Sequence, residues 1–243
     1  MELYPYVIRK ELTQIFEQVR KAVEENKSGF TMSPAINIIY KVAGRHIKSE
    51  LNYDLIAKSF NHAFFLLNFL KNLIFLDVAL DHGFVCDSDV LDIGCGSAPA
   101  SIAAHKLFLE RGLKQRRFTL IDKSQRQINM AKMLCKTMGI DVKFYSIDPF
   151  NFQDGPYNDT AFLSYFICEQ SKDFIDKLYQ QQDQFKHGFI VIDYDYVVDH
   201  IVNTFSPKRG HSIQAIGVSA TLPKELANCL RRDEVTIYGC FYS

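Results

Sequence analysis

The feature that most constrains the fold is an alternation of short apolar runs with amphipathic segments, which begins near residue 89. Such runs, separated by helical patterns, are typical of βαβ units around a parallel sheet. We expect seven strands, at 90–93, 118–121, 142–145, 161–163, 189–192, 213–218 and 235–241. Helices are expected between them, at 101–111, 124–138, 172–182 and 197–205. The fold class is therefore α/β, with a mostly parallel sheet and helices on both faces.

The chain before this alternation has a helical pattern. Apolar residues recur at spacings of three and four between residues 6 and 26, and a second helix is expected from 34 to 47. A third helix, 53–80, is so rich in Phe and Leu that we expect it to be buried on more than one side. The chain therefore divides into an N-terminal helical extension at 1–86 and an α/β domain at 87–243.

Composition narrows the function. Lys+Arg and Asp+Glu each number 28, so no net charge attracts nucleic acid or anionic lipid. The 6 cysteines are scattered without His/Cys clusters at zinc-like spacing, which predicts reduced thiols and no metal site. The start of the chain lacks the pattern of a signal peptide, and Asn68, Lys71, Asn72 and Asp77 interrupt the most apolar stretch. We therefore expect a cytoplasmic protein with no membrane span.

The segment VLDIGCGSAP at 90–99 is the strongest indicator of chemistry. Its strand ends near Asp92, and the small residues that follow let a ligand approach the backbone of Gly94 and Gly96 closely. The second strand ends with Asp122, whose carboxylate can accept hydrogen bonds from both ribose hydroxyls of a nucleoside. Asp148 follows the third strand at the same edge of the sheet. Three acids at successive strand ends predict a nucleotide-type pocket.

This segment resembles the first motif of the class I S-adenosylmethionine-dependent methyltransferases, approximately V-L-D-x-G-x-G-x-G, with Ala98 in place of the last glycine. The resemblance covers about residues 89–243 and implies a Rossmann-like class I methyltransferase fold with S-adenosyl-L-methionine as cofactor. It implies that the glycine loop surrounds the methionine part, Asp122 holds the ribose and Asp148 faces the adenine. The residues predicted to bind the cofactor are Asp92, Gly94, Cys95, Gly96, Asp122, Lys123, Asp148, Pro149, Phe150 and Ser164.

The acceptor is expected beyond the fourth and fifth strands, because ligands of open α/β sheets bind outside the carboxyl ends of the strands. Methyl transfer to an oxygen or nitrogen needs an in-line approach and a nearby base. Tyr165, Glu169 and Asp193 are the candidate catalytic residues. In relatives of this fold, additions before the first strand commonly form a lid. The resemblance therefore implies that 1–86 is a helical lid for substrate recognition and 87–243 the catalytic domain.

A methyltransferase acting on an oxygen or nitrogen of a small molecule or short peptide is the first interpretation, because neutral charge and an aromatic-rich cover favour a compact acceptor. RNA is an alternative acceptor, since Lys27, Lys41, Arg45 and Lys48 form a local basic patch without acids. A non-catalytic partner subunit that binds the cofactor is another alternative.

Two further alternatives concern the glycine loop. Residues 94–101 are similar to the G-S-G-x-x-P-x-T/S loop of nicotianamine synthases, which transfer the aminocarboxypropyl arm of the same cofactor. A nicotinamide-dinucleotide enzyme is disfavoured, because its loop requires a third glycine where this chain has Pro99. Asp92 also places negative charge where a pyrophosphate would sit.

Overall fold

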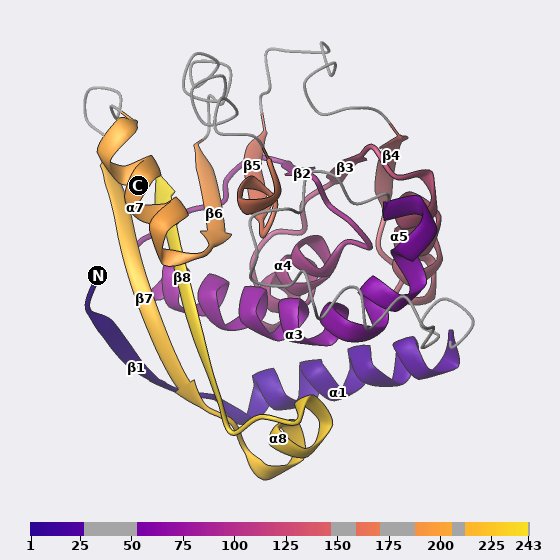
Figure 1. Ribbon diagram of the computed structural model, residues 1–243, viewed down its shortest axis with the longest axis horizontal. Coiled ribbons are helices and arrows are strands. Elements are labelled where there is room, and N and C mark those ends of the chain that lie inside the picture. The colour runs from indigo at the N-terminus through magenta and orange to yellow at the C-terminus, as the bar shows by residue number, and fades with distance from the viewer. Residues whose placement is uncertain (27–52, 147–158, 171–187, 206–211, 243) are drawn as a thin grey trace.

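The structure is a computed structural model that describes residues 1–26, 53–146, 159–170, 188–205 and 212–242. Its centre is a sheet of eight strands (Figure 1), in the order β1-β7-β8-β6-β5-β2-β3-β4. Of these strands, β8 runs antiparallel to both neighbours and the other pairings are parallel. Strands β4-β3-β2-β5-β6 follow the order of a doubly wound sheet, whose direction of winding reverses between β2 and β5. The fold is Rossmann-like, as expected for the class I methyltransferase fold.

All seven expected strands are present. They are β2 (Val90–Ile93), β3 (Phe118–Asp122), β4 (Val142–Ser146), β5 (Thr160–Ser164), β6 (Phe189–Asp193), β7 (Ile213–Thr221) and β8 (Glu234–Tyr242). Each of β2, β5 and β6 is buried on both faces, except for Ser164 at the end of β5. Such burial explains why these strands appear in the sequence as continuous apolar runs.

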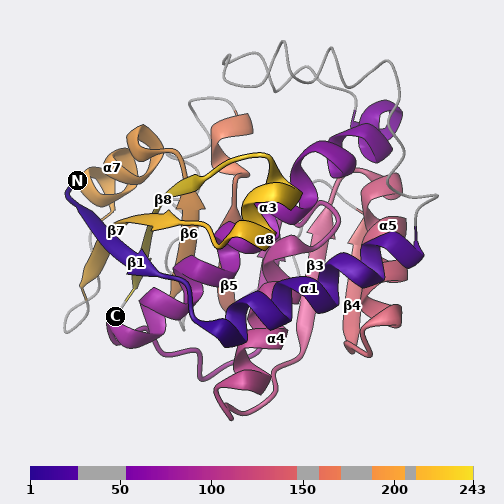
Figure 2. The ribbon, with the colours of Figure 1, turned by 90° about the horizontal axis from the view of Figure 1, so that it is seen from below.

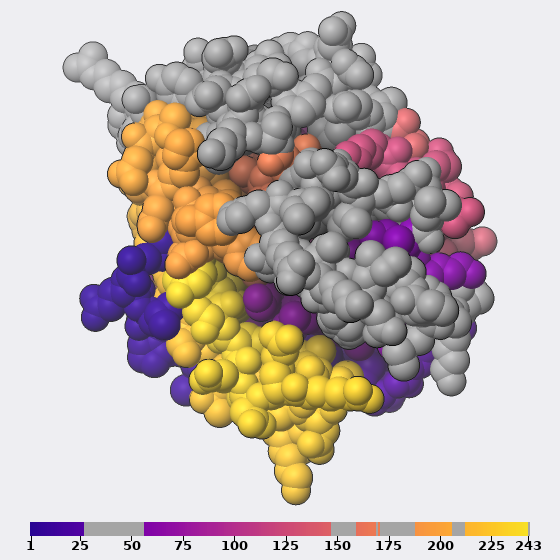
Figure 3. Space-filling model, in the orientation of Figure 1, coloured from indigo at the N-terminus to yellow at the C-terminus, as the bar shows by residue number. Residues whose placement is uncertain are grey.

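The eighth strand, β1 (Leu3–Val7), corrects the expectation of a helix from residue 6. It pairs in parallel with β7, from Leu3 opposite Gly217 to Val7 opposite Thr221, and forms an edge of the sheet. Pro5 has no amide hydrogen to donate, which an edge strand tolerates. The surface view shows this N-terminal segment at the rim of the molecule (Figure 3), and Val7 is 87% exposed.

The helices form two layers. Helices α1 (Lys10–Glu25), α3 (Tyr53–Asp81), α4 (Pro99–Glu110), α5 (Gln125–Thr137) and α8 (Lys224–Leu230) contribute to the core cluster on one face (Figure 2). Helix α7 (Asp195–Thr204) and the 3-10 turn η4 (Ile167–Glu169) contribute to the cluster on the other face. Sequence analysis did not predict α8. The expected helices 34–47 and 172–182 lie outside the described residues.

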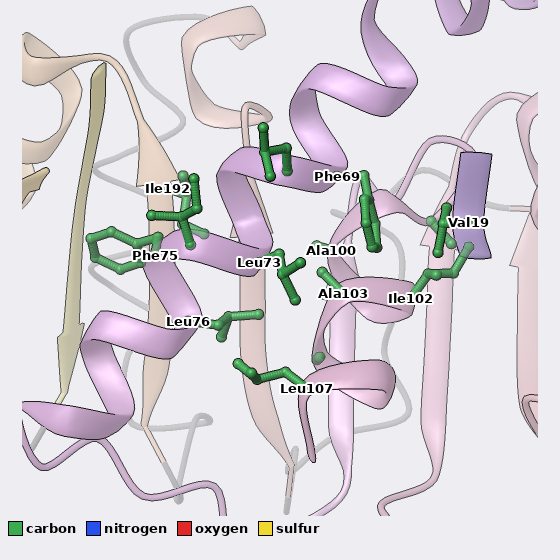
Figure 4. Close-up of a cluster of buried hydrophobic side chains, with 14 of the residues drawn as sticks. Val19, Phe69, Leu73, Phe75, Leu76, Ala100, Ile102, Ala103, Leu107 and Ile192 are labelled. Carbon is green, nitrogen blue, oxygen red and sulfur yellow. The ribbon is translucent and has the colours of Figure 1, made fainter. Parts of the chain in front are cut away.

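Helix α3 lies at the centre of the larger cluster. Phe69 and Leu73 are fully buried, and they pack near Ala103 and Leu107 of α4 and Val19 of α1 (Figure 4). Among the described residues, Ile56–Asp81 is long and apolar enough to cross a membrane, but 61% of its most apolar window is buried in the protein. We had expected the polar residues of this helix to exclude a membrane span, but its length and composition pass that test. Its burial in the protein instead identifies it as a core helix.

One buried acid joins α3 to the elements on both sides of it. Asp77 is 0% exposed and accepts hydrogen bonds from Tyr6 Oη at 2.5 Å, Arg9 Nη2 at 2.6 Å and Arg111 Nη2 at 2.5 Å. These bonds lower the pKa of the Asp77 carboxyl despite its burial. Because Tyr6 lies in β1 and Arg111 directly follows α4, this cluster ties β1, α3 and α4 together.

Candidate cofactor-binding site

A pocket lies where the winding of the sheet reverses, beyond the carboxyl ends of β2, β3 and β5. Open α/β sheets bind ligands at this place. The lining includes the loop after β2, the end of β3, the loop after β5 and one side of α3. The lining residues are Phe60, Asn61, Phe65, Asn68, Gly94, Cys95, Gly96, Ser97, Pro99, Asp122, Lys123, Gln127, Ser164, Tyr165, Phe166 and Gln170.

The glycine loop is anchored to β3 and shaped by left-handed residues. The amides of Gly94 and Cys95 donate to the Ile121 carbonyl at 2.8 and 3.0 Å. Gly94 and Gly96 have φ of 70° and 54°. A side chain on Gly94 would overlap the Phe166 ring, whereas the corresponding space at Gly96 is open. Gly96 therefore gives a ligand access to the backbone, and Gly94 allows the loops after β2 and β5 to touch.

Ala98 also occupies the left-handed region, with φ of 68°, directly before Pro99 at the start of α4. A glycine adopts this conformation without strain, which explains why the related motif has a glycine at this position. The loop therefore keeps the backbone shape of the motif despite the substitution, with Ala98 fully buried.

Asp122 fixes the pocket from the end of β3. One carboxylate oxygen accepts the Gly96 amide hydrogen at 2.9 Å, and the other accepts that of Ser124 at 2.7 Å. A carboxylate offers about four acceptor positions, so these two amides do not by themselves fill it, and a ligand hydroxyl can also donate to it. Ser124, where a helix was expected to begin, in turn caps α5 by accepting the Gln127 amide hydrogen.

Asp92 lies beneath the loop and outside the pocket lining. Its side chain is 1% exposed and accepts a hydrogen bond from Ser101 Oγ of α4 at 2.6 Å. Burial raises the pKa of the Asp92 carboxyl to about 7, and the charge of Asp122 adds to this rise while Ser101 opposes it. Asp92 is therefore placed to influence the loop through Ser101 and through its charge.

The raised pKa predicts how stability depends on pH. The folded state holds the Asp92 proton more tightly than the unfolded state, so the protonated carboxyl stabilises the fold. This stabilisation is fully present below the pKa of the unfolded state and is lost as pH rises through about 7. Between about pH 4 and pH 8, Asp92 should lower the free energy of unfolding on the order of 4 kcal/mol. Asp92→Asn should remove this decrease of the free energy of unfolding with pH, measured by urea titrations at several pH values. An unchanged pH dependence in this variant would contradict the raised pKa.

Helix α3 forms a wall of the pocket, through residues that sequence analysis did not assign. Asn61 is 3% exposed, accepts a hydrogen bond from Ser97 Oγ at 2.7 Å and donates to Gln127 Oε1 at 2.8 Å. The glycine loop, α3 and α5 therefore share one buried polar cluster. The signal was present in the sequence, because Asn61, Asn68 and Asn72 recur on one side of an otherwise apolar helix.

The loop after β5 supplies the opposite wall. Asn72 Nδ2 of α3 donates to Ser164 Oγ at 2.8 Å, which leaves the Ser164 hydroxyl proton directed elsewhere. Tyr165 is left-handed, with φ of 51°, and its amide donates to the Ile192 carbonyl of β6 at 2.7 Å. Burial and the nearby Asp193 raise the pKa of the Tyr165 phenol well above its usual value. The phenol is therefore a hydrogen-bond donor at neutral pH.

Asp193 lies behind this wall and does not line the pocket. It is 1% exposed and accepts the amide hydrogens of Cys168 at 3.1 Å and Tyr194 at 2.8 Å. It therefore positions the turn after β5. The side chain of the third candidate, Glu169, lies outside the described part of the structure, as do Asp148, Pro149 and Phe150.

The remaining predicted residues lie at the pocket. Lys123 is exposed at its edge, and Cys95 is buried in its lining. Burial raises the pKa of the Cys95 thiol well above its usual value, so the thiol is not a nucleophile at neutral pH. In the described ranges no group of three or more His, Cys, Asp or Glu side chains is arranged to hold a metal ion. The basic patch at residues 27–48 lies outside them.

Comparisons with known proteins add only the fold. No protein-family model matches the sequence, and no curated protein matches it. Solved structures with a similar fold include a tRNA (uracil-54, C5)-methyltransferase of Pyrococcus abyssi, with 12% identity and a TM-score of 0.46. The similar region covers 70% of this chain but only 38% of that methyltransferase.

Two other similar structures are closer in length. The precorrin-6y C5,15-methyltransferase of Geobacter metallireducens has 14% identity and a TM-score of 0.47, with 74% of this chain and 85% of that chain covered. The ribosomal protein L11 methylase of Lactobacillus delbrueckii subsp. bulgaricus has 20% identity and a TM-score of 0.45, with coverage of 75% and 79%. Similarity at this level carries no information about substrate.

Proposed function

We propose that this chain is an S-adenosyl-L-methionine-dependent methyltransferase that acts on an oxygen or nitrogen of a small molecule or short peptide. The observation that carries the proposal is the arrangement of Asp122 and Gly96. A carboxylate at the end of the second parallel strand is bonded to the glycine loop, at the edge of a pocket where the sheet reverses its winding. A carboxylate in that position suits the ribose of a nucleoside.

The residues present fit this cofactor. Asp122 would hold the ribose hydroxyls, and the open space at Gly96 would admit the ligand against the backbone. Phe60, Phe65 and Phe166 give the pocket apolar walls for its uncharged parts. When bound, the cofactor supplies a methyl group on a positively charged sulfur, which a nucleophile can accept.

The charges of the site favour this cofactor over a dinucleotide. The Gly96 amide, which could otherwise bind a phosphate, already donates to the Asp122 carboxylate. Asp92 places a second acid beneath the same loop. A pyrophosphate would meet repulsion from Asp122 and from the ionised fraction of Asp92, whose pKa is about 7, whereas a ligand with an ammonium and a sulfonium would meet attraction.

The acceptor would lie between α3 and the loop after β5. Ser164 and Tyr165 line that side, and both can donate hydrogen bonds to an acceptor oxygen or nitrogen. Asp193 would act as a positioning residue through the turn that it holds. Glu169, one of the three candidate catalytic residues, stays a prediction, because its side chain lies outside the described residues. We expect the protein to act in the cytoplasm.

A direct test identifies the product formed from the cofactor. Purified protein is incubated with S-adenosylmethionine and with small-molecule, peptide or RNA fractions, and the by-products are identified by mass spectrometry. S-adenosylhomocysteine formed with a small-molecule or peptide fraction would support the proposal. Methylthioadenosine would indicate aminocarboxypropyl transfer, turnover with RNA alone would indicate an RNA methyltransferase, and binding without turnover would favour a non-catalytic subunit.

Asp122→Asn tests the cofactor site without requiring an acceptor. The substitution removes the charge that accepts hydrogen bonds from the loop and from ribose hydroxyls, and bonds to a charged group contribute about 1.5–3 kcal/mol each. We therefore expect affinity for S-adenosylhomocysteine to fall about tenfold to hundredfold in calorimetric titrations. Asp199→Asn, at an exposed aspartate of α7, is the control and should bind like the unmodified protein. Equal affinities in both variants would reject the assigned ribose site.

A further inference from the structure

A lysine of α3 extends the side of the helix that faces the pocket. Asn68 lines the pocket, and Lys71 follows it by one turn on the same side of the helix. Lys71 Nζ lies 5.1 Å from the centroid of the Tyr165 ring, and Tyr165 also lines the pocket. The ammonium is therefore next to the wall that we assign to the acceptor.

The charge of Lys71 is not neutralised by any residue in the described ranges, where it makes no hydrogen bond or ion pair. Its side chain is largely buried, and this burial, together with the positive charge of Arg232, lowers the pKa of Lys71 to about 8. The face of an aromatic ring stabilises such an ammonium only weakly and does not replace a carboxylate partner. Asp77, a charged residue of the same helix, in contrast has two arginines and a tyrosine from other elements as partners.

A buried charge without a counter-ion is costly, so a ligand that supplies the counter-ion gains affinity. The neighbouring residue supports a binding role for this place. Asn72 is 1% exposed and positions the Ser164 hydroxyl at the pocket, while its Oδ1 atom accepts no hydrogen bond from the part of the chain that the structure describes. Buried polar groups normally have hydrogen-bond or ionic partners, so two adjacent polar side chains that lack them are not explained by packing alone.

We propose that Lys71 binds an oxyanion of the acceptor, a carboxylate or a phosphate, beside the Tyr165 ring. This inference rests on the proposed function, because it places the acceptor in the pocket opposite Asp122. Arg232 adds positive charge to the same region. Ser164 supplies a hydroxyl that can donate to the oxyanion or to the group that is methylated. The acceptor is therefore an acid with a flat or apolar body that fits against the tyrosine.

The test compares anionic and neutral probes of the same shape. Binding of benzoate, phenyl phosphate and benzamide is measured by NMR titration at neutral pH, in protein saturated with S-adenosylhomocysteine. We expect at least one anion to bind about tenfold or more tightly than benzamide, which corresponds to about 1.4 kcal/mol. Lys71→Met keeps most of the stem, removes the charge and should abolish this preference. Preference for benzoate or for phenyl phosphate would distinguish a carboxylate from a phosphate acceptor.

Lys132→Met is the matched control, because Lys132 is an exposed lysine over another ring, that of Phe144 at 5.5 Å. It should retain the anion preference. Thermal unfolding checks the fold of Lys71→Met, which should be at least as stable as the unmodified protein because a buried charge is removed. Equal binding of all three probes to the unmodified protein, or an unchanged preference in Lys71→Met, would overturn the proposal.

The same titrations separate this inference from the proposed function. Binding of S-adenosylhomocysteine without any preference for an anion overturns the role of Lys71 alone. If the protein does not bind S-adenosylhomocysteine, the proposed function fails, and probe titrations of the protein without it then test Lys71 as an independent anion site. Loss of the preference in Lys71→Met with unchanged S-adenosylhomocysteine binding supports both.

Discussion

Replacing Asp77 by alanine is expected to lower the free energy of unfolding by about 3 kcal/mol, measured by urea titration at neutral pH. The fully buried carboxylate is the common acceptor of Tyr6, Arg9 and Arg111. Without it, the tyrosine hydroxyl and both guanidinium groups lose a charged partner. Breaking buried pairs typically costs about 3–5 kcal/mol. The lower end applies because Arg9 also contacts Glu110 and Arg111 also contacts Asp81.

Asp81→Ala is the matched control for this prediction. Asp81 lies one turn further along α3 and pairs with the same Arg111 at 3.0 Å, but its side chain is 54% exposed. Exposed pairs contribute about 0–1 kcal/mol, so the loss of stability should be under about 1 kcal/mol. Similar effects of the two substitutions would mean that the Asp77 cluster does not tie β1, α3 and α4 together.

The strands could be predicted from the sequence because burial on both faces leaves a simple signal. Runs such as Val90–Ile93 and Phe189–Asp193 are apolar almost throughout, and turn residues bound them. The signals that bound two expected helices are equally local: Ser124 caps α5 at its start, and the left-handed Gly112 and Gly139 directly follow the expected helices 101–111 and 124–138. These features depend on residues close in sequence, and the structure agrees with the predictions.

Two elements could not be predicted because their stability depends on distant partners. Strand β1 is short and mostly exposed, so its five residues carry no alternation of buried and exposed side chains, and its pairing with β7 selects the extended form. Helix α8 has seven residues, too few for a periodic pattern to be distinct. In both cases tertiary contacts decide a local conformation that the sequence leaves ambiguous.

The candidate site was only partly predictable for the same reason. Gly94, Gly96 and Asp122 belong to one strand-and-loop motif, and the structure brings them together. Asn61 lines the pocket, and Lys71 lies next to the Tyr165 ring of its wall; both belong to a helix that precedes the motif in the chain. Their polarity within an apolar helix was visible, and we used that of Lys71 only against a membrane span. Polar residues that recur on one side of a buried helix are better interpreted as facing a site.

Gly94→Ala is expected to have the largest effect on the pocket itself. The new Cβ would lie 2.0 Å from Cδ2 of Phe166, and its φ of 70° is unfavourable for alanine. Left-handed backbone costs about 1–2 kcal/mol and overpacking about 1–3 kcal/mol, so the free energy of unfolding should fall by about 2–5 kcal/mol. Because the loops after β2 and β5 must separate, affinity for S-adenosylhomocysteine should also fall, by about a hundredfold or more in calorimetric titrations.

Gly96→Ala separates the clash from the loss of a left-handed glycine. Its Cβ would meet no atom within 4 Å, so stability should fall by only about 1–2 kcal/mol while the methyl group occupies space that the ligand needs.

Adding Phe166→Ala to Gly94→Ala should relieve the clash, so the two substitutions together should cost less than the sum of their separate effects. Strict additivity would contradict the contact between the two loops. The contact matters because it joins Gly94, in the glycine loop, to the segment that carries Ser164 and Tyr165, so that two walls of the pocket pack against each other.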